Sequence, residues 1–96
     1  MEKTKVIFRK FKNSQDVIAI FPQIPGKTLP YRTCRAYTIA GYRDIGTNYT
    51  KSTTELVYRH EYKELYEKLV SIGYDLDVCT RMTNTDKLKR TSACRE

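Results

Sequence analysis

Tyrosine and arginine side chains are the residues of this 96-residue chain whose types and spacing best fit a binding surface. The chain has eight tyrosines and no tryptophan, and four of the tyrosines fall between residues 31 and 49 among three arginines. Aromatic rings and guanidinium groups bind the bases and phosphates of single-stranded nucleic acids, and they also dominate protein–protein hot spots. The candidate binding residues are therefore Tyr31, Arg32, Arg35, Tyr37, Tyr42, Arg43 and Tyr49.

Catalytic and metal-binding chemistry has few candidate residues in this sequence. His60 is the single histidine, and the three cysteines are far apart without a C-x-x-C spacing: Cys34, Cys79 and Cys94. A closed zinc site needs about four nitrogen or sulfur ligands, and acid–base catalysis needs a base or split carboxylates beside a reacting group. We expect no enzyme, no cofactor and no metal site. Cys34 and Cys79 are predicted as core residues, and Cys94 as a thiol on a tail.

The formal charge of +7 is distributed unevenly along the chain. Residues 1–43 carry nine basic and two acidic side chains, whereas residues 44–96 carry nine of each. This asymmetry is typical of a patch that attracts a polyanion, and it is equally compatible with ordinary solubility charge. Both interpretations place the excess positive charge on the part of the chain that is rich in predicted strands.

Three β-strands are predicted in the first half of the chain. Residues 5–11 and 17–21 are rich in β-branched and aromatic residues, which suit a pleated surface, and the polar turn between them makes a hairpin. The second strand is apolar on both faces and so belongs in the middle of the sheet. Pro22 is expected to end it, because proline cannot donate a backbone hydrogen bond. Residues 33–40 alternate small with large side chains, and the small face would suit a closely packed helix.

Two loops and a short strand complete the predicted first half. Residues 23–32 contain two prolines and a glycine, and residues 41–46 begin and end with glycine, so both segments are predicted loops. Residues 47–52 are polar and are predicted as a short edge strand. Long loops in small domains often carry function. The candidate binding residues lie in or beside these segments, which agrees with a binding role.

An amphipathic helix from about Thr53 to Ile72 is the most strongly indicated element. Apolar side chains recur every three or four residues along it, and charged side chains occupy the opposite face. Three residues could cap its start, namely Ser52, Thr53 and Thr54, although Val57 and these threonines also suit an extended chain, which would delay the helix to about Arg59. Gly73 can adopt the left-handed conformation that ends a helix. The tyrosines of this stripe are predicted as core: Tyr58, Tyr62, Tyr66 and Tyr74.

The end of the chain is predicted to contain one strand and a tail. Residues 76–82 alternate apolar and polar side chains, as a strand does, whereas residues 83–96 contain a single large apolar residue and are predicted to be disordered. The expected fold is therefore an α+β domain over residues 1–82, followed by a polar basic tail. Four or five mostly antiparallel strands, in the order βββ(β)αβ, would carry one helix on one face of the sheet.

Two blocks of the sequence resemble a set of small uncharacterised proteins encoded by bacteriophages and mobile elements of gut bacteria. The first block is Val6–Lys12 with Val17–Pro22, and the second is Glu61–Leu69 with Ser71–Val78. The resemblance implies a mobile-element origin and expression in the cytoplasm of a bacterial host. It carries over no catalytic residue, and the stretch Leu29–Ser52 departs from it.

These features together favour a small non-catalytic binding protein that acts on a host protein through its basic, tyrosine-rich half. A nucleic-acid-binding protein that uses the same surface is the alternative. A homo-oligomer is also compatible with the sequence. No segment approaches the ~20 apolar residues that cross a bilayer, so no membrane partner is expected.

Overall fold

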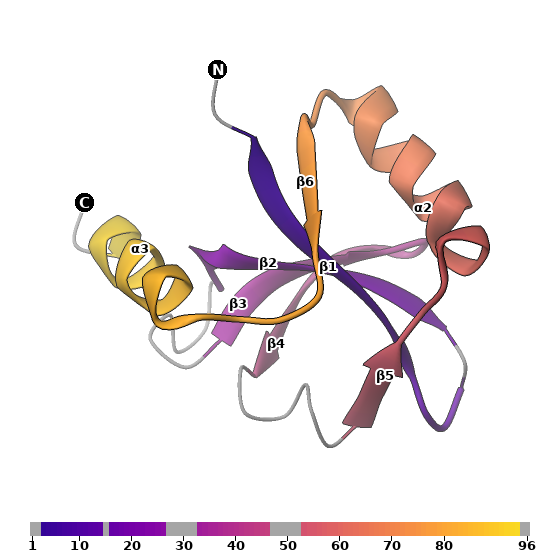
Figure 1. Ribbon diagram of the computed structural model, residues 1–96, viewed down its shortest axis with the longest axis horizontal. Helices are drawn as coiled ribbons and strands as arrows, with labels where there is room; N and C mark the ends of the chain where they lie inside the picture. Colours follow the sequence, from indigo (N-terminus) through magenta and orange to yellow (C-terminus); the bar gives the residue numbers. More distant parts are fainter. Residues whose placement is uncertain (1–2, 15, 27–32, 47–52, 95–96) are drawn as a thin grey trace.

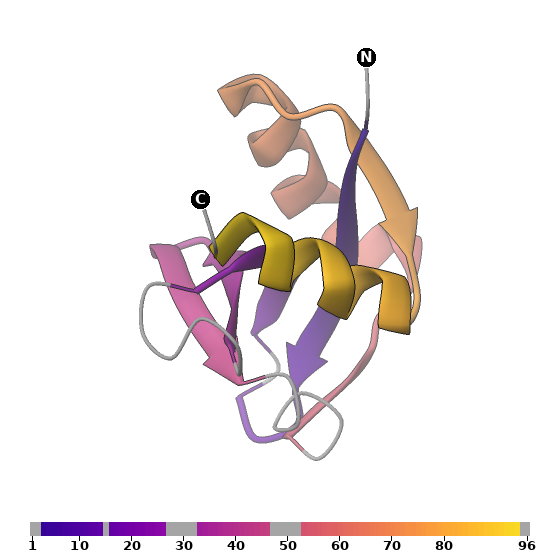
Figure 2. The same ribbon diagram turned by 90° about the vertical axis from the view of Figure 1, so that its left-hand side faces the viewer.

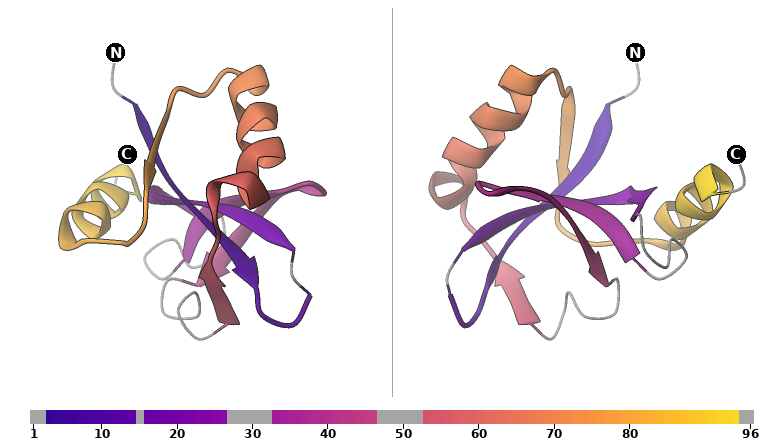
Figure 3. Two further views of the ribbon diagram at one scale, coloured as in Figure 1. Left: turned by 45° about the vertical axis from the view of Figure 1, so that its right-hand side comes forward. Right: turned by 180° about the vertical axis from the view of Figure 1, so that it is seen from behind.

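A twisted sheet of six strands forms the framework of the computed structural model, which describes residues 3–14, 16–26, 33–46 and 53–94 (Figure 1). The strands are β1 (Thr4–Phe11), β2 (Val17–Pro25), β3 (Thr33–Thr38), β4 (Gly41–Gly46), β5 (Thr54–Leu56) and β6 (Leu76–Cys79). The helices are α2 (Arg59–Ile72) and α3 (Asn84–Cys94), and they lie on opposite sides of the sheet (Figures 1 and 3).

Strand β1 organises the sheet, because three strands pair with it. The order across the sheet is β4-β3-β2-β1-β5, with all of these neighbours antiparallel. The edge of β1 away from β2 is shared: residues Thr4 to Ile7 pair with β6 in parallel, and Arg9 to Phe11 pair with β5. The expected α+β class with a mostly antiparallel sheet is thus confirmed, and the structure adds a sixth strand and a second helix.

Two hydrophobic clusters cover the two faces of the sheet, because β1 and β2 are apolar on both. The α2 face buries Val6, Phe8, Ala19, Phe21, Tyr37, Leu65, Leu69 and Leu76. The other face buries Ile7, Ile18, Ile20, Cys34, Ala36 and Ile45. Burying an aliphatic or aromatic side chain stabilises the fold by roughly 1.5–3 kcal/mol, so these residues supply much of the stability. The small side chains of β3 face away from α2, and Tyr37 packs beneath that helix instead.

Helix α2 begins at Arg59, the later of the two predicted starts. Residues 54–56 pair with β1 as strand β5, so the threonines do not cap the helix. The Glu61 carboxylate instead accepts the Tyr58 backbone N–H at 2.8 Å, while the Tyr58 carbonyl accepts the Glu61 N–H at 2.9 Å. The predicted end is confirmed: Gly73 has φ of 124°, and its N–H bonds to the Val70 carbonyl.

Several predictions about the strands are wrong. The third and last predicted strands end earlier than expected, β3 at Thr38 and not at residue 40, and β6 at Cys79 and not at residue 82. Strand β2 continues past Pro22 to Pro25, because the register shifts between Phe21 and Pro25 and so removes the need for a proline N–H in the ladder. Residues 41–46 form strand β4 and not a loop. The predicted edge strand at 47–52 lies outside the described residues.

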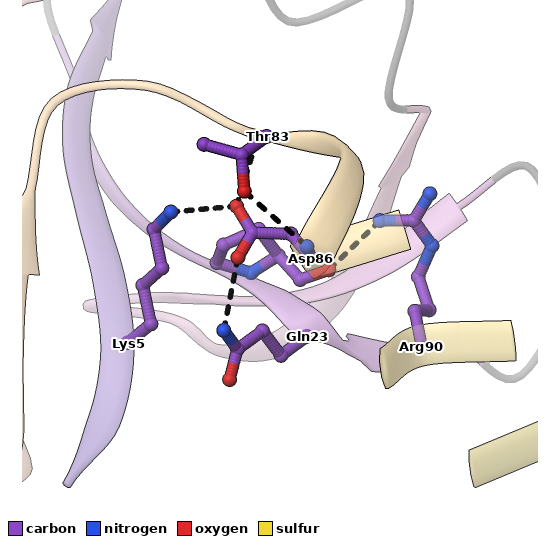
Figure 4. A network of polar contacts seen from close by, with 6 residues as sticks. Lys5, Gln23, Thr83, Asp86 and Arg90 are labelled. Atoms are coloured by element: carbon purple, nitrogen blue, oxygen red, sulfur yellow. Dashed lines mark hydrogen bonds and ion pairs between the residues drawn. The ribbon is translucent and has the colours of Figure 1, made fainter. Parts of the chain in front are cut away.

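The prediction of a disordered tail is also wrong, because residues 84–94 form helix α3. Figure 2 shows this helix lying across the strands. Among residues 84–92, the buried side chains are Asp86 and Arg90, whereas the one large apolar residue of the helix, Leu88, is 68% exposed. Polar contacts hold the helix: Asp86 accepts hydrogen bonds from Lys5 at 2.6 Å and Gln23 at 2.9 Å, and Arg90 donates to the Pro22 carbonyl at 2.8 Å (Figure 4).

No helix among the described residues is both long and apolar enough to cross a membrane.

Candidate functional site

The β3–β4 hairpin carries four of the predicted binding residues. Its strands pair in the register Tyr37 with Tyr42, Ala36 with Arg43 and Arg35 with Asp44. Directly paired residues of an antiparallel ladder project to the same side of the sheet, and successive residues alternate sides. Arg35, Tyr37 and Tyr42 therefore share the face that α2 covers.

Tyr42 is held on this face by three neighbours. Its ring meets the Tyr37 ring edge-on at a centroid distance of 4.9 Å, and the Arg35 guanidinium carbon lies 5.3 Å from its centroid. Its hydroxyl lies 2.6 Å from the hydroxyl of Tyr74, whose ring stacks on Phe21. We call these four residues, Arg35, Tyr37, Tyr42 and Tyr74, the Tyr42 platform.

The platform joins a buried base to an exposed ring. Tyr37 is buried in the core beneath α2, whereas Tyr42 is 51% exposed. Burial, and then the hydrogen bond with Tyr42, raises the pKa of Tyr74 to about 12. The Tyr74 phenol therefore stays protonated well above physiological pH, where it can keep its hydrogen bond with the Tyr42 hydroxyl.

Arg43 lies on the opposite face of the sheet from the platform. It follows Tyr42 directly, so strand alternation turns its side chain the other way, and its guanidinium carbon lies 5.4 Å from the centroid of the Phe11 ring. The predicted binding residues therefore do not form one surface. Three further predicted residues, Tyr31, Arg32 and Tyr49, lie outside the described residues.

The excess positive charge of the first half is partly matched by acids from the second half. Lys5 pairs with Asp86, and the Lys10 ammonium lies 3.0 Å from the Glu61 carboxylate and 3.7 Å from that of Glu55. The hydrogen bond to Glu61 is the main reason that the pKa of Lys10 is raised. Acids from the second half thus neutralise part of the positive charge of the first half in the folded protein. These ion pairs argue against a strong polyanion-binding patch on the first half.

The two cysteines with described side chains are protected thiols. Cys34 is buried, its thiol lies 3.8 Å from the Ile45 carbonyl, and burial raises its pKa to about 12. Cys79 is half-buried against the same cluster, and burial raises its pKa as well. A thiolate is the reactive form of cysteine, so neither thiol is activated. The prediction that both contribute to the core is confirmed, and the Cys94 side chain lies outside the described residues.

His60 is exposed on the first turn of α2, where its ring stacks on Tyr58 at a centroid distance of 5.9 Å. Tyr58 itself is exposed, so its predicted core role is wrong, whereas Tyr62, Tyr66 and Tyr74 pack against the α2-face cluster. Within the described ranges, no three His, Cys, Asp or Glu side chains gather closely enough to hold a metal ion.

Two hollows are lined mostly by residues that sequence reasoning did not assign to a site, with Arg43 in the first hollow as the exception. One, of about 620 Å³, lies where the two hairpin turns meet α2, with Phe11, Asp16, Ile39, Arg43 and Glu64 among its lining residues. The other, of about 320 Å³, lies between α2 and β6 and is lined by Arg59, Tyr62, Lys63, Tyr66, Glu67 and Val78. The helical spacing of Arg59, Tyr62, Lys63 and Tyr66 is visible in the sequence, but their closeness to Val78 is not.

Comparison with protein-family models, with curated proteins and with solved structures finds no match to this chain.

Proposed function

We propose that this protein is a non-catalytic binding module that holds a partner protein on the Tyr42 platform. The observation that carries the proposal is the half-exposed Tyr42 ring, which Arg35, Tyr37 and Tyr74 fix in one orientation. Tyrosine and arginine are, with tryptophan, the side chains most enriched in protein–protein hot spots, because they combine a large apolar area with hydrogen-bonding groups.

Pre-organisation supports this role. A free tyrosine side chain loses rotamer freedom when a partner binds, at a cost of about 0.5–1.5 kcal/mol for an immobilised side chain. Tyr42 is already restrained by the edge-on contact with Tyr37 and the hydroxyl contact with Tyr74. A partner that packs on its exposed side therefore gains contact area with little further ordering.

A protein partner fits the platform better than a nucleic acid does. Backbone phosphates require several unpaired cations on one surface. The platform carries Arg35, which lies opposite Asp44 in the β-ladder, whereas Arg43 is on the other face and Lys5 and Lys10 have acidic partners. A single-stranded nucleic acid is the alternative ligand.

The resemblance to proteins of bacteriophages and mobile elements suggests the source of the partner. On that basis we propose a protein of a bacterial host, met in the host cytoplasm.

The test compares the wild-type chain with Tyr42→Ala and with the matched control Tyr58→Ala, which removes another exposed tyrosine outside the platform. Partners captured from lysate of a gut bacterium are identified, and their affinities for the three purified chains are measured by calorimetry. Truncating a hot-spot residue costs more than about 1.4 kcal/mol, so Tyr42→Ala should weaken binding at least about tenfold. Tyr58→Ala should leave the affinity nearly unchanged.

Equal affinities of the wild-type chain and Tyr42→Ala would refute the platform. A gel shift separates the alternative, because nucleic-acid binding weakens steeply with salt through counterion release. A complex with single-stranded DNA or RNA at low salt that Arg35→Ala abolishes would favour the alternative over a protein partner.

A further inference from the structure

A groove between α2 and β6 lies apart from the Tyr42 platform. Its volume is about 320 Å³, and its walls are two turns of α2 on one side and Val78 of β6 on the other. Figure 1 shows the helix beside this strand. Val78 is 40% exposed, although Leu76, two residues earlier on the same face of β6, is buried. The face of β6 is therefore open where it borders the groove.

The outer edge of β6 presents unpaired backbone groups. The Asp75 carbonyl accepts the Thr4 N–H at 2.7 Å, and the register continues with Thr4 opposite Leu76 and Val6 opposite Val78. In a parallel ladder, alternate residues of a strand bond to the same neighbour. Asp75, Asp77 and Cys79 therefore face β1, which turns the N–H and C=O of Leu76 and Val78 outward. The described part of the chain places no strand on that side.

We propose that β6 accepts an extended acidic segment of a partner protein as an added strand. An open sheet edge is a template for strand addition, in which backbone hydrogen bonds supply affinity and pockets for alternate side chains supply specificity. Here the edge is β6, and the pocket beside it is the groove. Every second side chain of the added strand projects toward α2.

The walls of the groove define the chemistry of the occupant. Arg59 and Lys63 project from successive turns of α2, and neither forms an ion pair with another described residue. Glu67 is the one acidic residue among the described residues of the lining. The groove therefore favours an aspartate or glutamate of the occupant at its Arg59 end, in keeping with the +7 charge of the whole chain.

Aromatic side chains make the remaining wall apolar. Tyr62 and Tyr66 line the groove, and Tyr62 stacks on the buried Phe8 ring at a centroid distance of 4.2 Å. With Val78 they form an apolar surface behind the basic pair. The side chain of Asp77 does not point into the groove. Its register partner Lys5 pairs with Asp86 on the face of the sheet away from α2, and paired residues share a face. The matching segment carries an apolar residue two positions from an acidic one.

A random ten-residue peptide display library, panned against the full chain, tests the proposal. The selected peptides should share alternating apolar positions and an aspartate or glutamate. Amide hydrogen exchange then reports the mode of binding. The Val78 N–H should exchange rapidly in the free protein and at least about tenfold more slowly in the complex, whereas the Asp77 and Cys79 amides should be protected in both.

Two variants identify the site. Val78→Pro removes an outward N–H, and Arg59→Glu with Lys63→Glu reverses the charge of the groove; each should weaken peptide binding at least about tenfold. The double change Lys68→Glu with Lys87→Glu alters net charge equally, but at exposed positions outside the groove, and should bind nearly as the wild-type chain does. If Val78→Pro fails to fold, the variant with Arg59→Glu and Lys63→Glu tests the site by itself. Tyr42→Ala should bind the peptides normally, so this site and the platform are tested separately.

Several results would overturn strand addition at β6. These are a library that yields no peptide, selected peptides without acidic residues, an unprotected Val78 amide, or unchanged binding by the charge-reversed variant. A dimer in sedimentation that Val78→Pro dissociates would show that the occupant is a second copy of the chain. If a single-stranded oligonucleotide displaces the peptides, the groove binds a nucleic acid and not an acidic protein segment, which would overturn the proposal.

Discussion

At the scale of single residues, Asp86 shows how a charged group becomes part of the interior. Its carboxylate accepts hydrogen bonds from the Lys5 ammonium, the Gln23 amide and the Thr83 backbone N–H (Figure 4). Burial alone would raise the pKa of Asp86, but these bonds together outweigh it and hold the pKa below its ordinary value. A buried carboxylate that is this well bonded stabilises the fold only while it is ionised.

The first prediction concerns Asp86→Asn. The substitution leaves Lys5 without its counter-charge, so the free energy of unfolding at pH 7 should fall by about 1–3 kcal/mol. Because the pKa of Asp86 is depressed in the folded state, its contribution is present above the unfolded pKa of ~3.9 and is lost as pH falls through the lower folded pKa. Urea unfolding between pH 7 and pH 2 should therefore show a shallower acid loss for the variant than for the wild-type chain.

Asp75→Asn is the matched control, because Asp75 is exposed and its structural bond is made by its backbone carbonyl. Its unfolding free energy at pH 7 should stay close to that of the wild-type chain. If the two substitutions cost the same, the Asp86 network contributes nothing specific to stability.

At the scale of elements, the start of α2 depends on Glu61. Its carboxylate accepts the Tyr58 N–H and also pairs with Lys10 on β1, so one side chain caps the helix and ties it to the sheet. The bond to the Tyr58 backbone, followed by that to Lys10, holds the pKa of Glu61 below its ordinary value. The capping groups of helix ends are often local, whereas this one is completed by a strand about fifty residues away in sequence.

The second prediction concerns Glu61→Ala, with Glu64→Ala as the matched control. Both residues lie on α2, but the Glu64 side chain makes no hydrogen bond or ion pair with another described residue. The two changes therefore remove the same charge and differ in the capping contact. Glu61→Ala should lower the thermal midpoint and the helical circular dichroism signal, and Glu64→Ala should do so much less. Equal midpoints would show that the helix start does not need this contact.

At the scale of the whole molecule, the two clusters on either face of the sheet share strands β1, β2 and β3. A shared central strand couples the faces, because exposing one cluster disturbs the strand that carries the other. A domain of this size is expected to unfold as one cooperative unit. Cys34 is a natural reporter of that unit, since it is fully buried in the cluster away from α2.

The third prediction is that Cys34 reacts only through global unfolding. Burial raises its pKa to about 12, so at pH 8 the folded state supplies almost no thiolate. In a Cys79→Ser, Cys94→Ser background, the iodoacetamide reaction should slow as stability rises, and its free energy of opening should equal that of urea unfolding. Reaction much faster than the urea data allow would indicate local opening of β3.

Local patterns in the sequence predicted the elements whose cause lies within a few residues. The strand β1, the beginning of β2 and the end of α2 at Gly73 follow from alternation, apolar composition and left-handed glycine geometry, and the structure contains all three. The predicted binding residues Arg35, Tyr37 and Tyr42 also meet on one face, because strand alternation relates them to one another.

The remaining features depend on partners far away in the sequence. Strand β4 forms because β3 pairs with it, although two glycines make its sequence resemble a loop. Helix α3 forms where too few apolar residues predicted disorder, because Asp86 meets Lys5, 81 positions earlier, and Arg90 reaches Pro22. The groove beside β6 arises from the parallel pairing of β6 with β1. Local periodicity carries no information about such contacts, because each forms only when the folded sheet brings together residues that are far apart in the sequence.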